Sequence, residues 1–487
     1  MHERRLARPG LLAGLILAIF GLPALAQTVA SNSQPTASIE RADDLRRLVT
    51  DVPTGTKVAL VIADADSGVV SFAHEADLPL KPASLQKLLV TAAALERFGP
   101  GFSFQTRAFL NGAELWIVGA GDPAIGDTRL AERNAERKHL FDQCVEALRT
   151  AEISTLDKIV LDDSVFERQT RHPDWPESQS DRWYQAPVGG LNVNDNCLDA
   201  HARLHGDMVI LELTPDLPGN LFTHALTRGK PHRPVVHRPP DSDFFEFTGT
   251  VARNVTLRPV SVHRPTLFFA QALKHHLRKN HIKLSGDVVR RRLTDAELTT
   301  ATPIFTHTTS LPNVVWRCNT FSQNLFAECL LKSLAAYEPD GRRSDVAGGW
   351  NNGRTVLTET LTGLGIDLSK ATVRDGSGLS HSNRVTAATL VRLLVRMRHH
   401  PHASVFLDSL AKVGQPGTMY KRYDVPELRG RLRGKTGTLQ NVRALAGLLT
   451  RNDNTELAFA LLINGQASRD LPIRVCRVLI GTGDRAP

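Results

Sequence analysis

The chain has 487 residues, of which 41% are hydrophobic and 22% are charged. This length predicts two or three domains. The composition is that of an ordinary globular protein, so it excludes a disordered, collagen-like or coiled-coil chain. Fifty-nine Lys and Arg against 50 Asp and Glu give a net charge of +9.

The N-terminus has the pattern of a secretory signal peptide over residues 1–26. An Arg-rich start precedes the apolar stretch Leu11–Phe20, and Ala24-Leu25-Ala26 forms a small-residue cleavage site. The alternative, an uncleaved membrane anchor, is disfavoured because the apolar stretch is short. Cleavage before Gln27 removes three Arg and one Glu and leaves about +7.

An exported basic chain is expected to meet anionic surfaces such as phospholipid head groups or wall polymers. Export argues against nucleic acid as the partner. Later in the chain, no stretch reaches about 18 apolar residues, which excludes a polytopic membrane protein.

Five cysteines are too few for a disulfide scaffold, and their odd number leaves at least one unpaired within the chain. We interpret most of them as buried core residues. A bridge between Cys318 and Cys329 is the alternative for that pair.

The predicted elements before residue 104 are a helix, a strand hairpin and a second helix. They cover residues 39–49, 57–64 with 69–73, and 84–98. Between residues 105 and 298, short alternating strands separated by Gly, Pro, Asp and Asn predict one or two small mixed domains. The strands are expected over 114–118, 158–161, 208–213 and 243–250, and the helices over 127–151 and 265–280.

After residue 299 the chain is expected to be helical and then to end in strands and a closing helix. The helices are predicted over 320–336, 355–364, 386–399 and 469–481, and the strands over 432–439, 444–450 and 456–464. Together these elements predict an α/β sandwich whose central antiparallel sheet combines distant chain segments. Residues 27–104 and 299–487 would form this body, and residues 105–298 the insertion.

Three short motifs indicate chemistry. Ser84-Leu85-Gln86-Lys87 places a serine and a lysine on one face of a helix start, where an amine of lowered pKa can take the serine proton. Ser322-Gln323-Asn324 is a second polar motif, weak by itself. Lys435-Thr436-Gly437-Thr438 offers a cation, two hydroxyls and a glycine that lets the backbone approach a ligand.

These motifs occur in the order that β-lactamases and penicillin-binding proteins share. Ser84 and Ser322 lie 238 residues apart, which implies an insertion of domain size between two parts of one active site. The sequence is identified as resembling the class C low-molecular-mass penicillin-binding proteins, the D-alanyl-D-alanine carboxypeptidase/endopeptidases of peptidase family S13. Further shared segments are Gly121-Asp122-Pro123, Trp183–Pro187, Asp375–Ser380, Thr438–Gln440 and Leu445–Gly447.

The resemblance implies a transpeptidase-like catalytic domain and an acyl-enzyme on Ser84. Lys87 would be the general base, although the choice between the two lysines is contested in this superfamily. Ser322 would relay a proton to the leaving nitrogen while Lys435 polarises it, and Asn324 would hold the acyl chain amide and Lys87.

The resemblance also implies how a substrate is held. Residues 435–438 would bind its terminal carboxylate, and backbone amides of Ser84 and Thr438 would form the oxyanion hole. The substrates are peptidoglycan stem peptides, with β-lactams as inhibitors. No metal or organic cofactor is needed, and the location is periplasmic.

The sequence departs from the family at the stem-peptide site. In relatives an acidic residue stands five positions before the aromatic of the Ala-Pro motif. Here that position is Gln179, so Asp181 or Glu177 is the candidate substitute. His381 stands where Arg is common, and Gln440 is retained. The side-chain preference is therefore open, whereas the acylation chemistry is not.

Two rival functions remain. A β-lactamase would need a second well-placed base for fast deacylation, and no class A type Glu loop is identifiable. A non-catalytic wall-binding scaffold of the same fold is disfavoured because every expected catalytic side chain is present.

Overall fold

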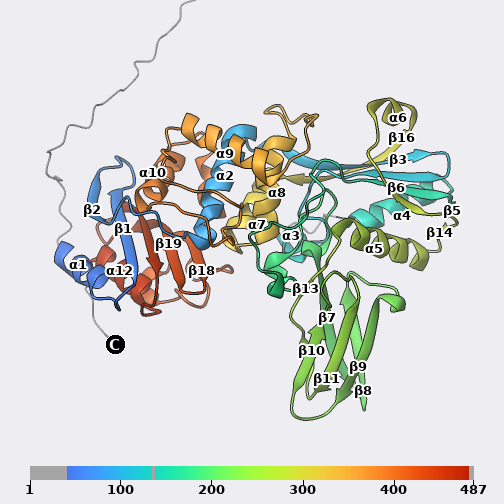
Figure 1. The fold of residues 1–487 in the computed structure, drawn as a ribbon, viewed down its shortest axis with the longest axis horizontal. Coiled ribbons are helices and arrows are strands. Elements are labelled where there is room, and N and C mark those ends of the chain that lie inside the picture. The colour runs from blue at the N-terminus through green and yellow to red at the C-terminus, as the bar shows by residue number, and fades with distance from the viewer. Residues whose placement is uncertain (1–40, 134–137, 482–487) are drawn as a thin grey trace, which may run out of the picture. The chain divides into compact units, whose positions relative to one another are not determined.

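The computed structural model describes residues 41–133 and 138–481 (Figure 1). The predicted signal peptide lies outside these ranges. Within them, no helix is both long enough and apolar enough to cross a membrane.

A six-stranded antiparallel sheet combines the start and the end of the chain (Figure 1). Its order is β17-β18-β19-β20-β1-β2. The strands are β1 (Lys57–Asp64), β2 (Val70–His74), β17 (Ala411–Lys412), β18 (Leu432–Leu439), β19 (Val442–Thr450) and β20 (Glu456–Asn464). Strand β1 pairs with β20 along its full length, with Ile62 opposite Phe459. The predicted union of distant segments in one sheet is confirmed.

Both faces of this sheet are covered by helices, which explains the nearly continuous apolar run of β1. Successive side chains of a strand point to opposite faces. Leu60 and Ile62 pack with the terminal helices, α1 (Ala42–Thr50) and α12 (Leu471–Ile480). Ala59 and Val61 belong to the core on the other face. That core is built mainly on α2 (Gln86–Phe98), α7 (Leu311–Thr320), α8 (Asn324–Ala336), α9 (Trp350–Gly363), α10 (Ala387–Arg398) and α11 (Ala403–Ser409).

A second, five-stranded sheet has the order β15-β6-β4-β3-β16. Its strands are β3 (Ser103–Asn111), β4 (Glu114–Val118), β6 (Lys158–Asp162), β15 (Val288–Arg290) and β16 (Thr302–Ser310). Its core includes residues of α4 (Leu140–Thr150) and α5 (Pro265–Lys279). Two short helices, α3 (Thr128–Arg133) and α6 (Asp295–Thr300), complete this part.

Smaller sheets occupy the middle of the chain. Strands β7 (Cys197–His205), β8 (Met208–Thr214), β12 (Val255–Thr256) and β13 (Val260–Ser261) form one sheet. Strands β9 (Phe222–Arg228), β10 (Arg233–His237) and β11 (Phe245–Val251) form another. Strands β5 (Thr155–Leu156) and β14 (Lys283–Leu284) pair separately.

Two predicted helices are wrong as single elements. The helix predicted over 127–151 divides into α3 and α4, because His139 is extended and its ring caps α4 by accepting from the Phe141 amide. The helix predicted over 320–336 covers the end of α7 and all of α8. Between them Ser322 has φ +61°, a left-handed conformation that interrupts an α-helix.

The predicted fold class, a mixed α/β fold with a central antiparallel sheet, is confirmed. The division at residues 105 and 298 stays a prediction. Strand β16 lies after residue 298, yet it pairs with β3 from Ser310 opposite Ser103 to Thr302 opposite Leu110. All five cysteines are buried and free, so Cys318 and Cys329 are not bridged.

Candidate active site

Ser84 lies in a short 3₁₀ turn, Ala83–Leu85, that leads directly into α2. Lys87 follows one turn later and is fully buried. Its Nζ lies 2.9 Å from Ser84 Oγ, 2.7 Å from Asn324 Oδ1 and 2.8 Å from the Ser377 carbonyl oxygen. An ammonium has three N–H donors, and these three acceptors satisfy all of them. A neutral amine at this position could accept a hydrogen bond from the Ser84 hydroxyl.

The second motif lies at the break between α7 and α8. The left-handed Ser322 ends one helix, and Asn324 begins the next. The Asn324 side-chain amide donates to the Tyr184 carbonyl oxygen at 2.7 Å, and its Oδ1 accepts a hydrogen bond from Lys87 Nζ. Both ends of the amide are therefore fixed. Ser322 and Asn324, on either side of the helix break, line one cavity with Ser84.

Gln323, the middle residue of this motif, is buried and donates to the Asp195 carboxylate. Asp195 also lies 3.2 Å from Arg317, and burial raises its pKa to about 7. An amide donor suits this carboxylate, whereas an aspartate at position 323 would repel it. The departure from the family pattern thus has a local reason.

The third motif is on β18, beside the 3₁₀ turn of Ser84. Lys435 is fully buried, and its Nζ lies 2.8 Å from Ser322 Oγ and 2.9 Å from the Thr436 carbonyl oxygen. A Cβ at Gly437 would lie 2.7 Å from the Pro82 carbonyl oxygen. Glycine therefore lets β18 approach the backbone that carries the serine.

Two buried lysines thus flank the serine motifs. Burial lowers the pKa of Lys87 to about 8. Burial, and secondarily the neighbouring Lys87 cation, lowers the pKa of Lys435 well below its ordinary value. Like charges at such sites disfavour each other. The lowered pKa values increase the share of neutral amine near neutral pH. Only the neutral amine can accept a proton as a general base.

A cavity of about 520 Å³ opens over these groups. Its lining includes Ser84, Ser322 and Asn324, and also the predicted substrate-binding residues Thr436, Thr438, Gln440 and His381. Burial, with help from nearby Lys81 and Arg384, lowers the pKa of His381, so its ring is neutral at pH 7. The neutral ring cannot replace an arginine as a permanent cation.

The structure does not bring Asp181 to this cavity. Its carboxylate lies 2.5 Å from Arg258 and 3.5 Å from Arg182, so an ion pair occupies it. Gln179 lines the cavity instead and accepts from the Tyr184 hydroxyl at 3.0 Å. A neutral amide therefore stands where an acidic residue is common in the family.

Sequence reasoning missed a buried carboxylate near Lys87. Glu328, on α8, accepts from the Ser377 amide at 2.7 Å, the Gly376 amide at 2.9 Å and the Trp350 indole at 2.8 Å. It thereby fixes the loop whose Ser377 carbonyl holds Lys87. Burial and the neighbouring Asp375 raise the pKa of Glu328 to about 7. Its position one helical turn after Asn324 was the only sequence signal.

Replacing Glu328 by Gln should lower the free energy of unfolding by about 1–3 kcal/mol. The new amide group would turn one acceptor into a donor facing a buried backbone N–H. Urea unfolding measures the loss, with Glu359→Gln on the exposed face of α9 as the matched control. Equal stability of the two variants would contradict this role.

Gly378, on the same loop, packs against the 3₁₀ turn that carries Ser84. It has φ +83°, and a Cβ there would lie 1.8 Å from the Ala83 carbonyl oxygen. Gly378→Ala should therefore cost roughly 2–4 kcal/mol, combining backbone strain with a clash, and displace Ser84. Gly365→Ala is the control, since φ is +79° there but nothing lies within 4 Å. Similar unfolding curves and acylation rates for both variants would refute the clash.

Comparison with known proteins identifies the family of this chain. The D-Ala-D-Ala carboxypeptidase 3 (S13) family matches residues 41–475. A D-alanyl-D-alanine carboxypeptidase of an Actinomadura species is 28% identical over 496 aligned positions, covering 92% of this chain and 87% of the relative. The Haemophilus influenzae D-alanyl-D-alanine carboxypeptidase DacB is 24% identical, and the alignment covers 92% of this chain and 93% of the relative.

Solved structures share the fold. The crystal structure of penicillin binding protein 4 from Haemophilus influenzae superimposes with a TM-score of 0.72 at 20% identity, over 90% of this chain and 98% of that chain. A Bdellovibrio bacteriovorus structure described as a predatory peptidoglycan endopeptidase gives a TM-score of 0.50 at 15% identity, over 84% and 86% of the two chains.

The family match and these relatives, together with a serine beside a buried lysine, define a serine hydrolase of the DD-peptidase class. Because the family match extends over nearly all of the described residues, the chain belongs to the D-Ala-D-Ala carboxypeptidase 3 (S13) family.

Proposed function

We propose that this enzyme cleaves D-Ala-D-Ala bonds of peptidoglycan stem peptides, and the equivalent cross-links, through an acyl-enzyme on Ser84. The observation that carries the proposal is the position of Lys87 Nζ, within hydrogen-bond distance of both Ser84 Oγ and Asn324 Oδ1. A candidate base in direct reach of a serine hydroxyl is the arrangement that nucleophilic catalysis requires.

In acylation, Ser84 Oγ attacks the carbonyl carbon of the penultimate D-Ala, and the neutral Lys87 amine takes the hydroxyl proton. The tetrahedral intermediate then collapses as its C–N bond breaks. The leaving nitrogen receives a proton through Ser322, whose Oγ contacts Lys435, and free D-Ala departs. Water hydrolyses the ester and restores the serine hydroxyl.

Binding would use the residues along β18. The backbone amides of Ser84 and Thr438 would stabilise the oxyanion, where one donor contributes about 10²–10³ in rate. Thr436, Thr438 and the Lys435 charge would receive the substrate carboxylate. Asn324, held by Tyr184, would orient the acyl chain. A β-lactam presents the same carbonyl and carboxylate.

Endopeptidase activity is part of the proposal because a cross-link has the same bond type after a D-Ala carbonyl. The Bdellovibrio relative is described as a peptidoglycan endopeptidase, and a Haemophilus influenzae structure as complexed with a β-lactam. We also propose export to the periplasm. The signal-peptide pattern supports export, and the net charge of about +7 after cleavage supports peripheral contact with anionic envelope surfaces.

Product analysis on defined muropeptides tests this function. A monomeric pentapeptide should lose its terminal D-Ala, and a cross-linked dimer should yield two monomers. Because Gln179 is neutral, a free side-chain amine on the stem peptide should raise the cleavage rate less in the wild type than in a Gln179→Glu variant. Hydrolysis of benzylpenicillin with no muropeptide cleavage would instead assign a β-lactamase.

A further inference from the structure

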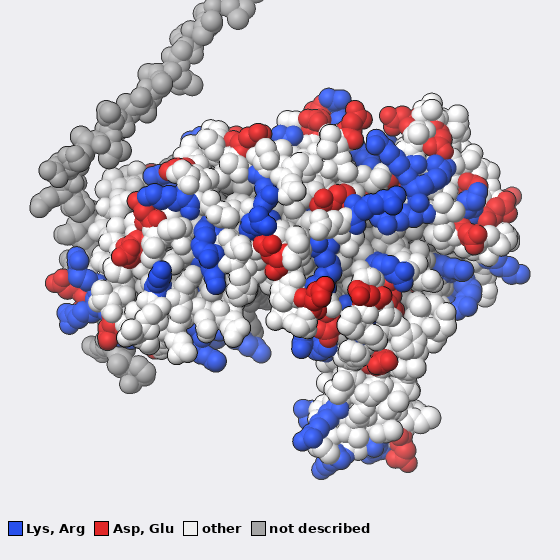
Figure 2. Space-filling model, in the orientation of Figure 1, with Lys and Arg blue, Asp and Glu red and all other residues white. Residues whose placement is uncertain are grey.

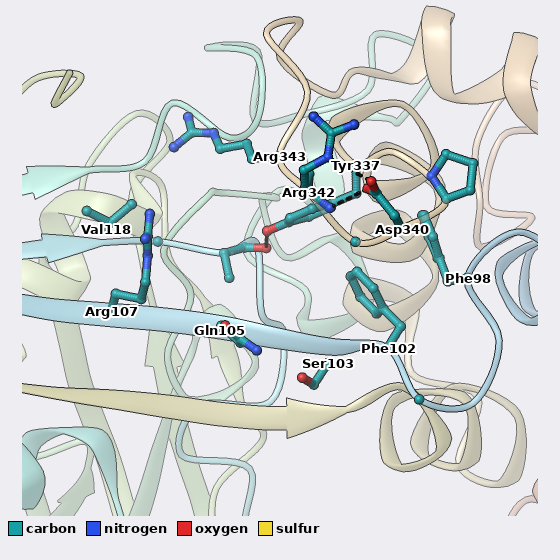
Figure 3. A pocket seen from close by; sticks show the side chains of 15 residues that line it. Phe98, Phe102, Ser103, Gln105, Arg107, Val118, Tyr337, Asp340, Arg342 and Arg343 are labelled. Carbon is teal, nitrogen blue, oxygen red and sulfur yellow. Dashed lines mark hydrogen bonds and ion pairs between the residues drawn. The ribbon is translucent and has the colours of Figure 1, made fainter. Parts of the chain in front are cut away.

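A second cavity, of about 460 Å³, lies outside the active site (Figure 3). It is bounded by the end of α2, by β3 and β4, and by the chain after α8. Phe98 and Phe102 stack with their ring centroids 4.6 Å apart, and Tyr337 meets Phe102 edge-on at 5.3 Å. The volume is in the range of small-ligand sites, and the rings offer a flat apolar wall.

The lining of this cavity is basic. Figure 3 shows Gln105 and Phe102 along one side, Arg342 and Arg343 along the other, and Arg107 at one end. Asp340 is the single acidic residue among the lining residues, and Arg342 binds it at 2.7 Å. An anion is therefore the complementary ligand.

Arg107 is the group best placed to bind that anion. Among the described residues no ion pair joins it to a carboxylate, and its guanidinium carbon lies 5.6 Å from the centre of the Phe109 ring. By contrast, Arg343 donates to Ser164 Oγ at 2.8 Å and lies 3.6 Å from Asp162. Arg107 thus presents an exposed guanidinium whose fork matches a carboxylate.

The basic surface extends beyond the cavity. Figure 2 shows Lys and Arg side chains gathered over the five-stranded sheet. Arg291 rests 5.7 Å over Trp116, which belongs to the same small apolar cluster as Phe109. Arg107 and Arg291 therefore share one face of the sheet, and an anionic chain could follow it away from the cavity.

The cavity is separated from the nucleophile by the length of α2. Phe98 and Lys87 are eleven residues apart on that helix, which corresponds to about 16 Å of rise. A ligand here would not touch Ser84. It would touch a different part of a polymeric substrate.

We propose that this cavity is an exosite for a carboxylate-bearing stem peptide of the peptidoglycan polymer. The peptide carboxylate would pair with Arg107, and its aliphatic part would lie against Phe98 and Phe102. This proposal rests on the proposed function, because the polymer is then the natural source of acidic peptide. The exosite would raise affinity for the polymer without changing acylation chemistry.

Binding to purified sacculi tests the exosite in a Ser84→Ala background, where nothing is cleaved. Arg107→Glu should weaken binding about tenfold, Arg107→Lys should restore part of it, and Arg46→Glu on exposed α1 should match the parent. A free acidic stem tripeptide should compete, and inorganic phosphate at the same concentration should not. Equal binding by Arg107→Glu and Arg46→Glu would overturn the proposal, as would equal competition by phosphate.

Benzylpenicillin acylation of the chain with Ser84 intact separates the two hypotheses. Arg107→Glu should be acylated at the wild-type rate while binding sacculi poorly. If acylation fell in parallel with sacculus binding in both Arg107 variants, the cavity would not be a separate site. If benzylpenicillin did not acylate the wild-type protein, the proposed function itself would be contradicted.

Discussion

Ser84→Ala should abolish release of D-Ala from a stem pentapeptide, with a loss of about 10⁴–10⁶-fold in kcat. The reason is that, among the residues that the structure describes, Ser84 alone places a hydroxyl within hydrogen-bond distance of the Lys87 amine, at 2.9 Å. Ser322 is held by the other lysine, at 2.8 Å. D-Ala release measured by chromatography gives the rate.

Ser382→Ala is the control, since this serine is exposed on the loop that follows Ser380. It should keep wild-type turnover. Retained turnover in Ser84→Ala would contradict the assignment of the nucleophile.

Lys87→Met should slow acylation by about 10²–10⁴-fold, the usual contribution of a general base. In the wild type, acylation should rise about tenfold per pH unit and level off above pH 8. The sign follows because burial lowers the pKa of Lys87 to about 8, and only the neutral amine above that pH can accept the serine proton. Stopped-flow acylation by benzylpenicillin across pH gives this profile.

Lys332→Met is the matched control, because Lys332 is another buried lysine whose pKa burial lowers to about 8. It lies 3.5 Å from the Trp350 ring and donates to the Gln169 carbonyl, so its loss should reduce stability and leave the pH profile intact. A rising profile that persists in Lys87→Met would move the base to Lys435.

The candidate catalytic groups could be proposed from the sequence because each belongs to a short motif with a distinct chemistry. The structure brings Ser84, Lys87, Ser322, Asn324 and Lys435 together, as the motif order predicts. What the motifs could not show is the left-handed Ser322. Helical patterning runs through residues 320–336, whereas at the break Gln323 contacts Asp195, a residue 128 positions earlier.

The residues that would contact the stem peptide were harder to predict, because the conformation of one loop decides which of its side chains reaches the cavity. Asp181 is only two residues from Gln179, yet it turns to Arg258, a residue 77 positions later. No local sequence pattern predicts such a long-range ion pair. Glu328 could not be predicted for a related reason. It accepts hydrogen bonds from the backbone amides of Gly376 and Ser377, which lie far away in the sequence.

The fold was predictable where strands are buried on both faces, as in β1 and β20, because their apolar runs are unambiguous. It was less so in the middle of the chain. Strand β8 alternates between exposed and half-buried residues, so its pattern gives little indication of its partners. The pairing of β3 with β16 spans about 200 residues and leaves no local signal.

The most direct single measurement is the intact mass of the purified protein after incubation with benzylpenicillin, followed by peptide mapping of the adduct. A serine DD-peptidase with Ser84 as nucleophile predicts one penicilloyl group per chain, located on the peptide that contains Ser84. An unmodified chain with intact antibiotic, or an adduct mapped to a different residue, would contradict that assignment.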